Sequence, residues 1–109
     1  MESAPVDQEE LRSIVERDLA RCSAELRAFF ARIAIPPVRW RLSPEGDYPG
    51  GFWAVARYED QVLWYNDIEE GFNVSRFVTA GKIPKDEYSG NQGDLCLALS
   101  GLLRRYRRG

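Results

Sequence analysis

The sequence predicts a single α+β domain spanning residues 1–109, in which a four-stranded antiparallel meander is packed by a long N-terminal helix and a C-terminal helix. Three observations indicate this α-β-β-β-β-α order. Apolar residues recur at helical spacing near the N-terminus, alternate with polar residues through the middle, and return to helical spacing in the last 15 residues. No internal repeat or linker divides the chain, so one core is expected.

The N-terminal helix is predicted as one continuous element from Asp7 to Ala34. Its apolar residues recur every three or four positions, at Leu11, Ile14, Val15, Leu19, Cys22, Leu26, Phe29, Phe30 and Ile33. Asp7 is placed to cap the first turn, and Glu10 three residues later completes a capping box. The pair Pro36-Pro37 is expected to end the helix, because proline cannot continue it.

Four segments show the alternation that is typical of strands: residues 38–42, 52–58, 61–66 and 72–78. Glu59 and Asp60 separate the second from the third and predict a two-residue hairpin turn, although the usual glycine is missing. Residues 79–93 are rich in glycine and are predicted to be irregular. Asp94 then caps a closing helix with a leucine-rich face and an arginine-rich C-terminal end, where the helix dipole favours positive charge.

Charge is distributed unevenly along a chain whose net charge is only −2. Residues 45–94 carry ten acidic and four basic side chains, whereas residues 95–109 carry four arginines and no acid. The acidic middle disfavours nucleic acid as a ligand, because neutralisation of phosphates dominates that affinity. A basic protein partner is electrostatically easier. No apolar run is long enough to span a membrane, and none has the form of a signal peptide, so we expect a cytoplasmic protein.

The cysteines and the absence of histidine restrict the chemistry. Cys22 and Cys96 both fall in predicted helices, and in a reducing cytosol we expect two free thiols in the core. A disulfide is the alternative if the two helices pack side by side. With no histidine, acid–base catalysis by that residue is excluded and a zinc site is disfavoured, so we expect no cofactor.

Two acidic clusters flank the strand 61–66 and form the candidate site. Glu59 and Asp60 precede the strand, and the loop Asn66–Gly71 that follows it carries Asp67, Glu69 and Glu70. We predict that these five carboxylates contact a partner, with Trp64 or Tyr65 as the apolar anchor, since aromatic residues dominate interface hot spots. Carboxylate oxygens also bind Ca²⁺ or Mg²⁺, but the spacing does not match an EF-hand loop, so no metal is predicted.

The aromatic residues of the strands are predicted to be mostly core. They fall on both faces of the alternating pattern, and one helix does not obviously cover both faces. Any part of the sheet that stays uncovered would be a binding surface or the contact of a homodimer.

The run from Val62 to Ser75, Val-Leu-Trp-Tyr-Asn-Asp-Ile-Glu-Glu-Gly-Phe-Asn-Val-Ser, resembles small bacterial proteins of the toxin-immunity type. The resemblance extends over residues 52–103 and includes a Gly81-Lys82-Ile83 turn and an Asn91-Gln92 segment before Leu95. It implies a compact, acidic α+β domain that binds and blocks a cognate toxin.

The function expected from the sequence is therefore protein binding rather than catalysis. The partner implied by the resemblance is a toxin. If that toxin is a nuclease, the acidic side chains would take the place of phosphates in its basic active-site cleft. The alternative is a small-ligand or regulatory domain with a pocket between the helix and a curved sheet.

Overall fold

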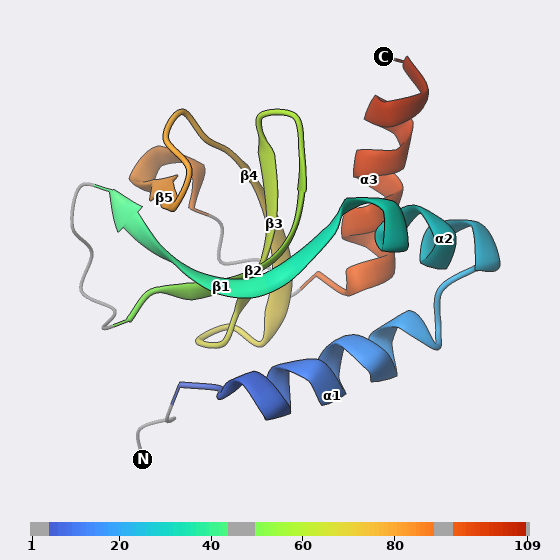
Figure 1. Cartoon of the computed structure of the whole chain (residues 1–109), viewed down its shortest axis with the longest axis horizontal. Helices are drawn as coiled ribbons and strands as arrows, with labels where there is room; N and C mark the ends of the chain where they lie inside the picture. The colour runs from blue at the N-terminus through green and yellow to red at the C-terminus, as the bar shows by residue number, and fades with distance from the viewer. Residues whose placement is uncertain (1–4, 44–49, 89–92, 109) are drawn as a thin grey trace.

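The part of the chain that the structure describes has an α+β fold, with three α-helices packed against a curled five-stranded sheet (Figure 1). The computed structural model describes residues 5–43, 50–88 and 93–108. In chain order the elements are α1 (Gln8–Leu19), α2 (Ala24–Ile33), β1 (Ala34–Ser43), β2 (Phe52–Tyr58), β3 (Gln61–Asn66), β4 (Gly71–Arg76), β5 (Lys82–Pro84), the 3-10 helix η1 (Lys85–Glu87) and α3 (Leu95–Arg108). The predicted class is confirmed, but the predicted four-stranded sheet lacks one strand.

The missing strand is β5, which lies in the segment predicted to be irregular. The sheet order is β4-β3-β2-β1-β5, and β5 pairs with β1 in parallel, whereas the other pairs are antiparallel. The N–H of Arg41 donates to the carbonyl oxygen of Gly81 at 2.9 Å, and Ile83 pairs with Leu42. Three residues are too few to show an alternating pattern, so sequence periodicity could not identify this strand.

The predicted N-terminal helix is wrong in its continuity, because it is two helices separated by a turn. The capping box at Asp7 and Glu10 is present and starts α1 as expected. However, α1 ends at Leu19, and Ser23 then caps α2 by accepting a hydrogen bond from the N–H of Leu26 at 3.2 Å. The apolar spacing of three and four continues through the turn, which hides the break in the sequence pattern.

Both prolines lie inside β1 rather than before it. The helix α2 ends at Ile33, and β1 begins at Ala34, whereas the prediction began the strand at Val38. The pairing of β1 with β2 shifts register between Ala34 and Val38, where Pro36 and Pro37 have no N–H to donate. The neighbouring pair β2–β3 shifts register between Ala54 and Ala56, so the sheet bulges around Val55.

Two separate hydrophobic cores cover the two faces of the sheet. The larger lies between the sheet and the helices and contains Leu11, Phe29, Ile33, Val55, Leu63, Tyr65, Phe72, Leu95, Leu99 and Leu102. The smaller lies on the opposite face, inside the curl of the sheet, and contains Trp40, Phe52, Ala54, Val62, Trp64 and Ile83, with Phe77 and Tyr88 packed against it. This second core explains why aromatic residues occur on both faces of the strands.

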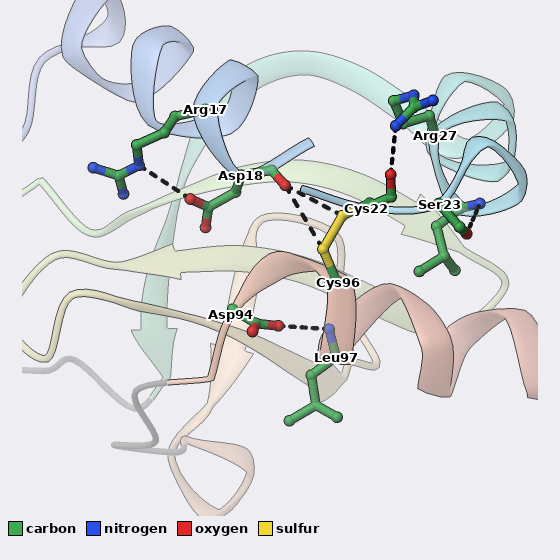
Figure 2. The surroundings of a disulfide bond; sticks show 9 residues. Arg17, Asp18, Cys22, Ser23, Arg27, Asp94, Cys96 and Leu97 are labelled. Carbon is green, nitrogen blue, oxygen red and sulfur yellow. Dashed lines mark hydrogen bonds and ion pairs between the residues drawn. A yellow bond between two sulfur atoms is a disulfide. The ribbon is translucent and has the colours of Figure 1, made fainter. Parts of the chain in front are cut away.

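The prediction of two free thiols is wrong, because Cys22 and Cys96 form a disulfide (Figure 2). Cys22 lies in the turn between α1 and α2, Cys96 lies in the first turn of α3, and their Cα atoms are 5.3 Å apart. The carbonyl oxygen of Asp18 lies 3.3 Å from the sulfur of Cys22 and 3.7 Å from that of Cys96. The disulfide therefore joins the turn after the C-terminal end of α1 to α3.

As predicted, Asp94 caps α3, because its side chain accepts a hydrogen bond from the N–H of Leu97 at 2.8 Å.

Candidate functional site

The two predicted acidic clusters lie at opposite ends of β3, about 20 Å apart for a six-residue strand. The first is the β2–β3 turn, where Tyr58 pairs with Gln61 and leaves Glu59 and Asp60 as the two-residue loop that was predicted. Glu59 has a φ of 53°, so the turn uses a left-handed residue without glycine. The second is the β3–β4 turn.

Arginine side chains compensate the charge of the β2–β3 turn. Arg105 of α3 lies 3.1 Å from Asp60 and 3.6 Å from Glu59, and Arg76 of β4 lies 3.7 Å from Asp60. All four side chains are partly exposed, so each pair contributes little to stability. Nevertheless, the pairs cancel the negative charge that the sequence predicted at this turn.

Asn66 shapes the β3–β4 turn from inside the protein. Its side-chain oxygen accepts hydrogen bonds from the N–H groups of Ile68 at 3.0 Å and Glu69 at 3.1 Å, and its amide nitrogen donates to the hydroxyl of Tyr88 at 3.1 Å. Asn66 is completely buried, and Glu70 has a φ of 60°. The turn therefore holds a fixed shape in which Ile68 is 51% exposed, Glu70 is exposed and Glu69 is half-buried.

Asp67 fastens the chain before α1 to this turn. Its side chain is only 6% exposed, and its Oδ2 atom accepts a hydrogen bond from the N–H of Val6 at 3.0 Å. The carbonyl oxygen of Val6 accepts from the indole of Trp53 at 2.7 Å and from Arg39 at 3.3 Å. The guanidinium of Arg39 stacks over the Trp53 ring at 4.3 Å. Asp67 thus has a structural role, and its Oδ1 atom is buried without a partner.

The bond between Val6 and Asp67 brings the first turn of α1 to the same end of the molecule as the β3–β4 turn. The exposed or half-buried carboxylates gathered here are Asp7, Glu9, Glu10, Glu69 and Glu70, which we call the acidic end. Among the residues that the structure describes, none of the five is in an ion pair. These carboxylates therefore form no ion pair within the described residues, in contrast to those of the β2–β3 turn, although Arg39 also lies at this end and donates to the carbonyl oxygen of Val6.

Neither predicted aromatic anchor is at the surface. Trp64 is completely buried, with its indole N–H donating to the hydroxyl of Ser75 at 2.9 Å and its ring beside those of Phe52 and Tyr88. Tyr65 is 6% exposed and packs on Phe72. Burial raises the pKa of the Tyr65 phenol, and the carboxylates of Glu70 and Asp67 raise it further.

Ile68 is an exposed apolar residue of this region, and it was not among the contact residues predicted from the sequence. It lies between Asp67 and Glu69 in the β3–β4 turn. The sequence feature that could have identified Ile68 as an exposed apolar contact is its position as a lone aliphatic residue within an acidic loop.

A groove of about 500 Å³ opens between α1 and β1. Its apolar lining comes from α1, α2 and the bulged part of the sheet, namely Leu11, Val15, Phe30, Ala34, Ile35, Pro37 and Val55. Its polar lining is Gln8, Glu9, Arg12 and Glu16, all exposed and all on α1. The groove lies beside the two register shifts, which fall between Ala34 and Val38 and between Ala54 and Ala56, and such shifts have no sequence pattern that predicts them.

Within residues 5–43, 50–88 and 93–108, no three Cys, Asp or Glu side chains are grouped so that they could hold a metal ion. The same part of the chain contains no helix that is both long and apolar enough to cross a membrane.

Comparisons with protein-family models, with curated proteins and with solved structures returned no match.

Proposed function

We propose that this chain is a protein-binding module that presents its acidic end to a basic surface of a partner protein. The single observation that carries the proposal is the contrast between the two acidic clusters. Glu59 and Asp60 are paired with arginines of the same chain, whereas Glu69 and Glu70, beside the acidic first turn of α1, form no ion pair with any residue that the structure describes. Unpaired charge on a fixed surface is what accelerates association with a partner of opposite charge.

The construction of the β3–β4 turn also supports binding. The bonds from Asn66 to two backbone N–H groups and to Tyr88 fix the loop before any partner arrives. A preorganised loop loses little conformational entropy on association. Ile68, half exposed between the carboxylates, offers an apolar contact in place of the buried Trp64.

The particular kind of binding module we propose is a toxin-immunity-type protein. The stretch that carries this resemblance, Val62 to Ser75, contains most of β3, the β3–β4 turn and most of β4. An acidic surface would block a toxin whose active-site cleft is basic.

The proposal is tested with the polypeptide encoded by the gene adjacent to that of this chain. The two proteins are purified, and their association rate constant is measured by stopped-flow fluorescence at increasing salt concentration. We expect a complex whose association rate falls steeply as salt rises, because the Debye length shortens from about 10 Å at 0.1 M to about 3 Å at 1 M. No complex, or an association rate that salt leaves unchanged, would contradict the proposal.

A second candidate function is the binding of a small apolar ligand in the groove between α1 and β1. The observation that favours it is the groove itself, because its volume of about 500 Å³ lies in the range of ligand pockets. Titration with a fluorescent apolar dye, such as an anilinonaphthalene sulfonate, tests it. Saturable binding to the folded protein supports this candidate, and absence of binding argues against it.

A further inference from the structure

The groove between α1 and β1 is a built feature of the fold, because α1 is fixed at both of its ends. At the N-terminal end Asp67, Trp53 and Arg39 hold the backbone of Val6. At the C-terminal end the disulfide from Cys22 joins the following turn to α3. The helix α1, about 18 Å long for twelve residues, is therefore held beside the sheet at both of its ends.

The apolar lining of the groove is only partly covered by the rest of the chain. Val15, Phe30 and Ile35 are half-buried, although each is a residue type that prefers the interior. A concave surface that combines partly exposed apolar side chains with a polar rim is typical of the pocket that receives an anchor residue of a partner.

The charge of the rim indicates what surrounds that anchor. Glu9 and Glu16 line the groove on either side of Arg12, at positions i−3 and i+4, and offset its positive charge. The positive end of the α1 dipole is met by Asp7, whose carboxylate accepts from the N–H of Glu10 at 2.8 Å. The rim is therefore net negative, and at Glu9 it continues into the acidic end.

We infer that the groove between α1 and β1 receives a bulky apolar side chain of the partner protein, such as Leu, Phe or Trp, from a segment that also carries Lys or Arg beside it. The apolar side chain fills the space over Val15, Phe30 and Val55, and the cationic side chains meet Glu9, Glu16 and the acidic end. This inference rests on the proposed function and adds to it the place and the chemistry of the partner's anchor.

The test uses a matched pair of tryptophan variants. Ala34 is exposed and lines the groove, so Ala34→Trp places an indole over it; Ala31 is exposed on α2 and does not line the groove, so Ala31→Trp is the control. Circular dichroism and thermal unfolding first establish that both variants fold like the wild type.

The probe is a phage-displayed library of random short peptides selected on the immobilised wild-type protein. We expect the recovered peptides to share an apolar residue next to Lys or Arg, and to bind Ala34→Trp at least about tenfold more weakly than Ala31→Trp, as for loss of a hot-spot contact. Peptides without basic residues, or peptides that bind both variants equally, would overturn the inference. A wild-type protein that is dimeric, together with an Ala34→Trp variant that is monomeric, would also overturn the inference, because the groove would then hold a second copy of this chain.

The same variants separate this inference from the proposed function. If the adjacent-gene polypeptide binds the wild type and Ala34→Trp equally well, the proposed function stands and the groove inference falls. If that polypeptide does not bind but basic apolar peptides bind through the groove, the groove inference stands and the toxin-immunity assignment falls.

Discussion

Reduction of the Cys22–Cys96 disulfide is expected to lower the free energy of unfolding by about 4.4 kcal/mol. This value follows from loop-closure entropy in the unfolded chain, since the two residues are 74 positions apart in the sequence. Domains of this kind are stable by only about 5–15 kcal/mol, so the disulfide accounts for a large share of the total.

The effect is measured by urea denaturation of the same protein in its oxidised and dithiothreitol-reduced forms. The reduced form should keep its far-UV circular dichroism at zero urea, because a domain stable by about 5–15 kcal/mol still has a positive free energy of unfolding after a loss of about 4.4 kcal/mol. Its midpoint should move to lower urea by the equivalent of about 4.4 kcal/mol.

A double variant, Cys22→Ala with Cys96→Ala, is the control, and its midpoint should not respond to dithiothreitol. Equal urea midpoints for the oxidised and reduced wild-type protein would contradict the expected contribution of about 4.4 kcal/mol from the disulfide. Such a result would mean that the bond does not form in solution or that the unfolded chain is already constrained.

Three further predictions concern stability. Ser23→Ala should lower the free energy of unfolding by about 1 kcal/mol, because it removes the N-cap of α2. Ser13→Ala, at an exposed position inside α1, should cause no measurable loss. Equal urea midpoints for the two variants would count against a cap at Ser23. Ile83→Ala should lower the free energy of unfolding by about 2–5 kcal/mol, because this side chain is fully buried in the second core. Val78→Ala, at a residue that is 94% exposed, should leave it almost unchanged. A small effect at position 83 would argue against the position of β5. Burial raises the pKa of the Tyr65 phenol above 10.0, so above pH 10 the unfolded chain loses the phenol proton before the folded protein does, and the free energy of unfolding falls as pH rises. Tyr65→Phe should make this fall shallower. An unchanged slope of the free energy of unfolding against pH would exclude the buried phenol as its cause.

Local signals predicted much of the fold, because they depend only on neighbouring residues. The capping box at Asp7 and Glu10, the cap at Asp94 and the two-residue turn at Glu59-Asp60 were all predicted from short spacings and are all present. The extent of β2 and β3 was predicted from alternation alone.

The errors in the predicted fold depend on contacts between distant residues. The turn at Ser23 interrupts a helix pattern whose apolar spacing continues across it. The strand β5 depends on its pairing with β1, whose residues lie 41 positions earlier in the chain. Cys22 lies in the break between α1 and α2, and its bond to Cys96 was predicted only as the alternative, because free thiols are expected in a reducing cytosol.

The candidate site was predicted by composition and corrected by tertiary structure. A count of carboxylates treats Glu59 and Glu70 alike, but Arg105 lies beside Glu59 and no arginine forms an ion pair with Glu70 among the described residues. Likewise, Trp64 is a frequent type of hot-spot residue, yet the second core buries it completely.

The most direct test of the acidic end as a binding surface compares two charge reversals at exposed positions. Glu70→Lys changes the acidic end, whereas Asp86→Lys makes the same change in η1, at the opposite end of β3 and β4. The association rate constant with the adjacent-gene polypeptide is measured at low salt for both variants. We expect an association rate constant roughly tenfold lower for Glu70→Lys and nearly unchanged for Asp86→Lys. Equal rates for the two variants would contradict it.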